Sequence, residues 1–125
     1  MFRPAYGTPL GSNAPALSPR VPRVAGFLRS ATPSGATLAD SEQRLGRFVQ
    51  ARGLQLAGIY HERGFVTLSD AGPVLEEMLR LLGRGQLQGV VTLASYTFSW
   101  DYEVVRFVEQ RVAQLGGFVT YLYGR

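Results

Sequence analysis

Residues 71–94 read AGPVLEEMLRLLGRGQLQGVVTLA, and this stretch contains the two patterns that decide the fold. Its large apolar residues first recur at the i, i+3, i+4, i+7 spacing of a helix with one buried face, at Leu75, Met78, Leu79 and Leu82. Pro73 suits the first turn of that helix, and Ser69 or Asp70 is the expected N-cap. After a glycine-rich turn, the continuous apolar run 89–94 predicts a buried strand.

Outward from this stretch, the chain repeats the same alternation of strand and helix. Apolar runs predict three further strands, at residues 24–28, 54–60 and 118–123. Two further amphipathic helices have apolar faces formed by Leu45, Phe48 and Val49 in the first, and by Val104, Val105, Val108, Val112 and Leu115 in the second. Asp40 with Gln43 forms a capping box for the first of them, and Asp101 is the expected N-cap of the second.

The predicted order is β-α-β-α-β-α-β, in units of roughly thirty residues. We therefore expect an α/β fold, in which a mostly parallel four-stranded sheet lies between two helix layers in a three-layer αβα, flavodoxin-like arrangement. In such sheets, ligands bind at loops beyond the carboxyl ends of the strands. Here those loops are residues 30–37, 61–69 and 95–100.

The beginning of the chain differs in composition from the rest. Prolines alternate there with Gly, Ser and Ala, which predicts a disordered leader at residues 1–21, before one folded domain at residues 22–125. The net charge of +4 arises from four arginines before residue 38, where no acid occurs, because nine Arg and nine Asp or Glu balance in the remainder. Any DNA contact through the leader is therefore expected to be weak and salt-sensitive.

Several functional classes are excluded by composition. Cysteine is absent and His61 is the only histidine, which excludes thiolate and multi-histidine metal sites and argues against a histidine-based triad. Glycine-rich phosphate-binding motifs are missing, so no nucleotide, metal or other cofactor is expected. No window holds the roughly 18 consecutive apolar residues of a membrane span, and we expect a cytoplasmic protein without membrane attachment.

The first two loops offer few groups for chemistry. Arg29 would meet a phosphate or carboxylate of a ligand, or, in the favoured interpretation, pair with an acid of the protein itself. Ser30 is interpreted as an ordinary loop hydroxyl, because no base is visible beside it. His61 and Glu62 could form an acid–base pair, but a solvated strand end is the favoured interpretation.

The third loop, residues 95–100, is aromatic and carries no charge. An active site at this position would need an acid, a base or an arginine. Phe98 and Trp100 are equally compatible with lids of the core and with partly exposed interface anchors. Together with Tyr102, they are the candidate binding residues for a protein partner or for a second copy.

Four stretches follow one another in a recognisable order: VAGFLRSAT (24–32), DSEQRLGRFVQARGLQLAGIYHERG (40–64), the opening stretch 71–94, and SYTFSWDYEVVRFVEQRVAQLGGFVTYL (95–122). The first is similar to a strand ending in Tyr-x-Arg-x-Ser-Ser/Thr, the third to Arg-Pro-x-Leu-x-x-Met-Leu, and the fourth to Leu-Asp-Arg-Leu-Ser-Arg before a helix. Together they span about 99 residues and resemble the catalytic domain of the serine recombinases, the resolvase/invertase family. The resemblance implies a resolvase-like fold and DNA strand exchange through a serine nucleophile.

The chain departs from that family at most of the positions to which the resemblance assigns catalysis. Arg29 and Ser99 match the family pattern, but the nucleophile position holds Ala31, with Ser30 as the fallback nucleophile. Three positions where the family has arginine hold Gly72, Thr97 and Trp100. Because phosphoryl transfer needs a nucleophile and several guanidiniums, the resemblance implies a catalytically silent relative.

Three functions remain open from the sequence. The leading hypothesis is a non-enzymatic recombinase-like domain that acts through protein contacts, in a DNA-recombination context. The second is a divergent or truncated site-specific DNA recombinase, since the chain ends at Arg125, before the family's dimerisation helix and DNA-binding segment. The third is an unrelated flavodoxin-like domain that binds a small ligand.

Overall fold

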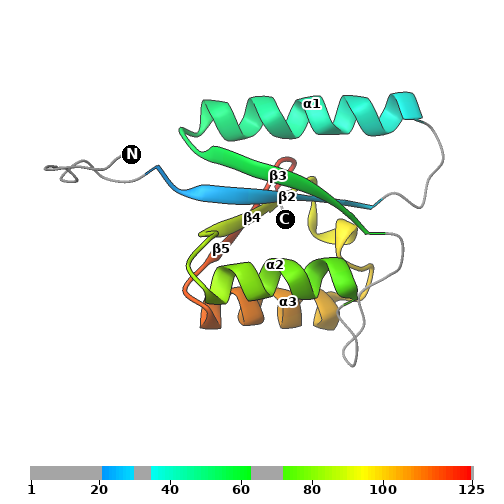
Figure 1. Cartoon of the computed structure of the whole chain (residues 1–125). Helices are drawn as coiled ribbons and strands as arrows, with labels where there is room; N and C mark the ends of the chain where they lie inside the picture. The colour runs from blue at the N-terminus through cyan, green and yellow to red at the C-terminus, as the bar shows by residue number, and fades with distance from the viewer. Residues whose placement is uncertain (1–20, 30–34, 63–71, 125) are drawn as a thin grey trace, which may run out of the picture.

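The computed structural model describes residues 21–29, 35–62 and 72–124. Its elements are, in order, β2 (Arg23–Arg29), α1 (Gly35–Ala51), β3 (Gln55–Glu62), α2 (Pro73–Gly83), β4 (Gly89–Thr92), the 3-10 turn η1 (Ser95–Thr97), α3 (Tyr102–Gln114) and β5 (Phe118–Tyr121) (Figure 1). Each predicted strand and helix is present. The predicted leader, up to residue 20, lies outside the described residues.

The four strands form one parallel sheet in the order β3-β2-β4-β5. Helix α1 covers one face of the sheet, and α2 and α3 lie side by side on the other (Figure 1). The predicted three-layer α/β arrangement is therefore confirmed. Because all four strands are parallel, their carboxyl ends lie at the same edge of the sheet.

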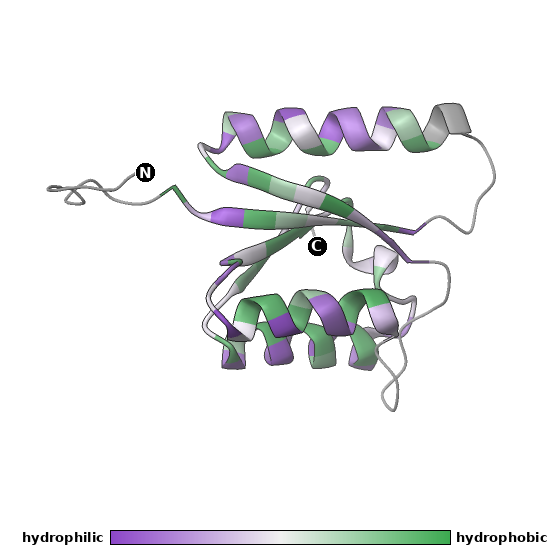
Figure 2. Ribbon diagram, in the orientation of Figure 1, coloured by the Kyte–Doolittle hydropathy of each residue, from purple (hydrophilic) through white to green (hydrophobic). Residues whose placement is uncertain are grey.

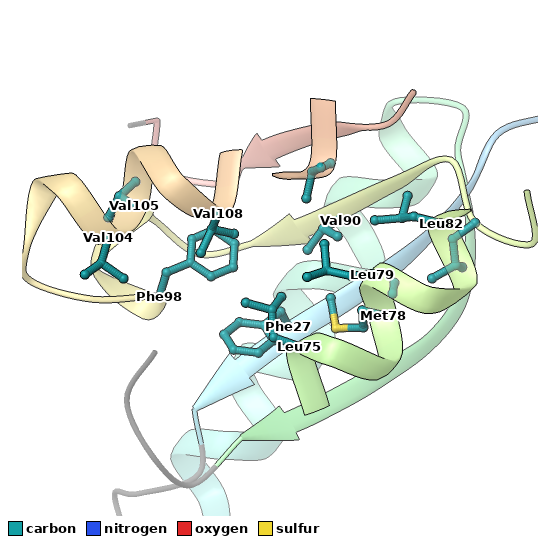
Figure 3. Close-up of a cluster of buried hydrophobic side chains, with 13 residues drawn as sticks. Phe27, Leu75, Met78, Leu79, Leu82, Val90, Phe98, Val104, Val105 and Val108 are labelled. Carbon is teal, nitrogen blue, oxygen red and sulfur yellow. The ribbon is translucent and has the colours of Figure 1, made fainter. Parts of the chain in front are cut away.

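Two apolar clusters hold the layers together. The larger fills the space between the sheet and the α2/α3 layer, where Phe27, Leu75, Met78 and Val108 are fully or almost fully buried (Figure 3). The smaller joins the sheet to α1 through Val24, Leu28, Leu45, Val49 and Val91. The strands are largely hydrophobic, while the helices carry alternating hydrophobic and hydrophilic bands (Figure 2). Each helix thus buries one face, as its sequence spacing predicts.

Side-chain alternation along β2 assigns its residues to the two clusters. Ala25 and Phe27 pack toward α2 and α3, whereas Val24 and Leu28 pack toward α1. Arg29 continues the first series and therefore points to the α2/α3 face. The pairing of β2 with the neighbouring strand β3 shifts between Val24 and Ala25. After this irregularity, the side chains of β3 no longer continue the alternation between the two faces that the residues before it follow.

Three details of the predicted helices are wrong. Helix α1 begins at Gly35, so Asp40 lies within the helix, where it pairs with Arg44 at 2.8 Å instead of capping. The N-cap of α2 is Gly72, not Ser69 or Asp70, because the helix begins directly at Pro73. Leu115 is the C-cap of α3 and is 37% exposed, so it is not part of the buried face of that helix.

Candidate functional site

Arg29 is the central polar residue at the carboxyl ends of the strands. Its Nη2 donates hydrogen bonds to two backbone carbonyl oxygens, of Thr97 at 2.5 Å and of Phe98 at 2.8 Å. The guanidinium therefore connects the end of β2 to η1 and the residue that follows it. Because Nη2 donates to the protein's own backbone, this part of the Arg29 guanidinium has a structural role.

Glu62 is the acidic neighbour of Arg29. The two residues are paired in register at the ends of β3 and β2. Burial lowers the pKa of the Arg29 guanidinium below its ordinary value, and the negative charge of Glu62 partly opposes this shift. The favoured interpretation of Arg29, an arginine beside an acid of the same protein, agrees with this geometry. The expected solvated strand end is wrong for Glu62, whose side chain is buried.

Gly72 lies against the Glu62 carboxylate. A Cβ atom at Gly72 would be only 2.6 Å from Glu62 Oε2, and the glycine has a φ of 85° and a ψ of 155°. Backbone with these angles is accessible almost only to glycine. The carboxylate also lies near the amino end of α2, where the helix dipole favours negative charge. Hence the space that a side chain at position 72 would need is taken by Glu62.

His61 and Glu62 do not form an acid–base pair. Successive residues of a strand point to opposite faces, and His61 Nε2 lies 2.8 Å from Glu42 Oε2 of α1. Glu62, in contrast, contacts the beginning of α2 on the other side of the sheet. The structure therefore separates the two residues that the sequence places together. Among the described residues, no group of three His, Cys, Asp or Glu could hold a metal ion.

The aromatic residues of the third loop have two different environments. Phe98 is completely buried, with its ring centroid 5.2 Å from that of Phe27 (Figure 3). The centroid of Tyr121 lies 6.3 Å from that of Phe98. Phe98 is thus a lid of the core, and its assignment as a surface anchor is wrong. Trp100 is 78% exposed and stacks on Tyr96, with centroids 5.1 Å apart and the rings inclined by 12°.

The exposed rings of this segment are Tyr96 and Trp100 in the loop and Tyr102 at the first position of α3, and we call these three residues the aromatic patch. Tyr102 is also exposed, and the guanidinium of Arg106 lies 6.0 Å from its ring centroid. The sequence pointed to Trp100 and Tyr102 but not to Tyr96 as a binding residue. The available signal was the spacing of four positions between Tyr96 and Trp100. Because loops have no fixed period, this spacing does not predict a contact between the two rings.

The serine and alanine positions of the resemblance are only partly described. Ser99 Oγ accepts a hydrogen bond from the Asp101 backbone N–H at 2.9 Å, so this hydroxyl helps to turn the chain into α3. Asp101 caps that helix as predicted, because its Oδ1 accepts from the Glu103 N–H at 2.9 Å. Ser30 and Ala31 lie outside the described residues. None of the helices that the structure describes is long and apolar enough to cross a membrane.

With the geometry established, comparisons with known proteins identify the fold. No protein-family model matches the sequence, and no curated protein sequence matches it either. The C-terminal catalytic domain of ISC1926 TnpA, an IS607-like serine recombinase, is similar with a TM-score of 0.68 and 11% identity, over 80% of this chain and 69% of that chain.

Two further solved structures are similar to the same extent. The N-terminal catalytic domain of TP901-1 integrase has a TM-score of 0.66 and 16% identity, over 80% of this chain and 76% of that chain. A resolvase family site-specific recombinase from Streptococcus pneumoniae has a TM-score of 0.66 and 17% identity, over 82% and 72%. This chain therefore has the resolvase-like α/β fold of serine recombinase catalytic domains.

Proposed function

We propose that this chain is a serine-recombinase-like domain that does not transfer phosphoryl groups and acts through protein contacts. The observation that carries the proposal is the environment of Arg29, the one strand-end arginine that the family resemblance retains. Its Nη2 is engaged by the carbonyl oxygens of Thr97 and Phe98, and its charge lies beside Glu62. A phosphate at this place would compete with internal acceptors and would also meet a carboxylate.

Position 72 supports the same conclusion. The resemblance assigns an arginine there, but this chain has a glycine with a positive φ beside the Glu62 carboxylate. A guanidinium could enter only if Glu62 and the backbone before α2 both moved. Thr97 is buried and Trp100 is uncharged, so neither supplies positive charge to a phosphoryl transition state.

The aromatic patch supports the choice of protein contacts as the mode of action. Trp100 is the residue type most enriched at the centres of protein interfaces, and it is among the most exposed large apolar residues that the structure describes. Rings of this kind offer a large contact area at a low cost in side-chain entropy. Two of its members, Tyr96 and Trp100, lie in the loop in which the family resemblance would put charged catalytic residues.

A second candidate is a divergent recombinase, which the shared fold with serine recombinase catalytic domains favours. In that case Ser30, next to the expected nucleophile position, would attack the DNA phosphate. The wild-type chain would then nick DNA, and Ser30→Ala would abolish the nicking.

Nicking of supercoiled DNA tests the proposal. Supercoiled plasmid is incubated with wild type or with Ala31→Ser. The control is Ala113→Ser, which makes the same change on the exposed side of α3. We expect no relaxed or nicked product from any of them, because each absent guanidinium lowers the rate by about 10²- to 10³-fold and three are absent. Nicking by Ala31→Ser, but not by Ala113→Ser, would show that the remaining site supports catalysis and would overturn the proposal.

A further inference from the structure

The aromatic patch has the chemistry of a surface that recognises proline- and arginine-rich peptide. Tyr96 and Trp100 stack face to face and are 42% and 78% exposed, so the face of the Trp100 ring that is turned away from Tyr96 is open to solvent. Extended proline-rich segments bind to aromatic surfaces of this type, because their rings pack on the aromatic faces and little conformational entropy is lost.

The charges beside the patch favour a cationic ligand. Asp101 and Glu103 are exposed and directly flank Tyr102 in the sequence. The nearby Arg106 already lies over the Tyr102 ring at 6.0 Å, which shows that the patch accepts a guanidinium on an aromatic face. The charged residues next to the patch in the sequence are thus two carboxylates and one guanidinium, which together carry a net negative charge. Nucleic acid is therefore disfavoured as its ligand.

One segment of this chain has the complementary composition. Residues 1–20 contain four prolines and two arginines, Arg3 and Arg20, and no acidic residue. We propose that residues 1–20 bind in cis to the aromatic patch, with prolines against the exposed face of the Trp100 ring and an arginine against Asp101 or Glu103. This inference rests on the proposed function only in so far as both assign the patch to contacts with polypeptide.

The length of the segment permits this contact. It joins the fold at Val21, before β2, whereas the patch follows β4 at the opposite ends of the parallel strands (Figure 1). The seven residues of β2 span about 23 Å. Twenty residues in a polyproline II conformation reach about 60 Å, which is enough to return along the sheet and still cover the patch. Covalent attachment gives the segment a millimolar effective concentration, so even weak affinity leads to binding in cis.

The chain contains a single tryptophan, Trp100, which makes fluorescence a direct probe of the patch. Acrylamide quenching of Trp100 is measured in the full chain, in Pro4→Ser/Pro9→Ser/Pro15→Ser/Pro19→Ser, and in Arg3→Gln/Arg20→Gln. Arg47→Gln/Arg84→Gln, which removes the same charge from exposed positions in α1 and directly after α2, is the control. We expect the quenching constant to rise roughly twofold in both leader variants and not in the control, because a peptide covers about one face of the ring.

Two outcomes would overturn the inference. Equal quenching in wild type and both leader variants would mean that the leader does not cover Trp100. Protection of Trp100 that increases with protein concentration would identify a second copy, rather than the chain's own leader, as the occupant. Neither outcome depends on DNA cleavage, so a failure here is distinguishable from a failure of the proposed function.

Discussion

Two aromatic residues of one short loop have opposite roles. Phe98 closes the apolar layer beneath α2 and α3, whereas Trp100, two positions later, lies on the surface. The sequence left both roles open because the loop has neither the period of a helix nor that of a strand. The structure resolves this through η1, which turns the backbone so that Phe98 points toward Phe27 (Figure 3).

This difference predicts different effects on stability. Phe98→Ala should lower the free energy of unfolding by about 3–5 kcal/mol, because it leaves a cavity beside Phe27. Trp100→Ala should change it by no more than about 0.5 kcal/mol, as for an exposed side chain. Urea unfolding monitored by circular dichroism measures both. A large loss for Trp100→Ala would show that this ring belongs to the core.

Gly72 combines a positive φ with a position directly beside the buried Glu62 carboxylate. Gly72→Ala should lower the free energy of unfolding by about 1–3 kcal/mol from the positive φ alone, and further because Glu62 must move. The control is Gly46→Ala within α1, where a Cβ meets no atom within 4 Å and where we expect a gain of about 0.5–1 kcal/mol. Equal effects of the two substitutions in thermal unfolding would contradict the assigned role of Glu62 at Gly72.

At the scale of elements, the beginnings of the helices were the least predictable feature. An aspartate with a glutamine three residues later is typical of a cap, and Asp40 satisfies that pattern although α1 begins five residues earlier. Asp101 satisfies a weaker pattern and is a true cap, since its side chain accepts from the Glu103 N–H. The difference arises because the residues before Asp40 are helical too. A local motif does not show whether the helix extends beyond it on the amino-terminal side.

The two aspartates therefore form a matched pair for experiment. Asp101→Ala should lower the free energy of unfolding by about 1 kcal/mol, because an N–H at the beginning of α3 loses its acceptor. Asp40→Ala removes only an exposed pair with Arg44 and should have a clearly smaller effect, which 0.5 M salt reduces further. The opposite ranking in chemical unfolding would mean that α1 begins near Asp40 in solution.

At the scale of the whole molecule, the layer order was predictable but the candidate site was only partly so. Apolar runs and helical spacing follow from burial, so they determined the number, type and order of the elements. The location of the site at the strand ends also followed from the parallel sheet. What could not be predicted was which side chains meet there, because the contact of Glu62 with Gly72 depends on a pairing irregularity in β3 that has no local sequence signal.

The distribution of charge predicts how the whole chain interacts with DNA. The excess positive charge of +4 is concentrated before residue 38, and Arg3, Arg20 and Arg23 are its main carriers around the leader. Binding to duplex DNA should therefore be weak, with a slope of log affinity against log salt of about −3 at most. Fluorescence anisotropy at several salt concentrations measures this slope. A slope near −6, or retention of affinity in Arg3→Gln/Arg20→Gln, would indicate a DNA-binding surface on the folded domain.

Trapping of a covalent protein–DNA adduct is the decisive test of the proposal that this serine-recombinase-like fold carries out no serine-recombinase chemistry. Wild type, Ala31→Ser and Ser30→Ala are incubated with end-labelled DNA and separated on a denaturing gel, where only a phosphoseryl bond retains DNA on the protein. We expect no adduct in any lane, because Arg29 is engaged by Thr97 and Phe98, and Gly72, Thr97 and Trp100 supply no positive charge. An adduct formed by wild type and abolished by Ser30→Ala would contradict it.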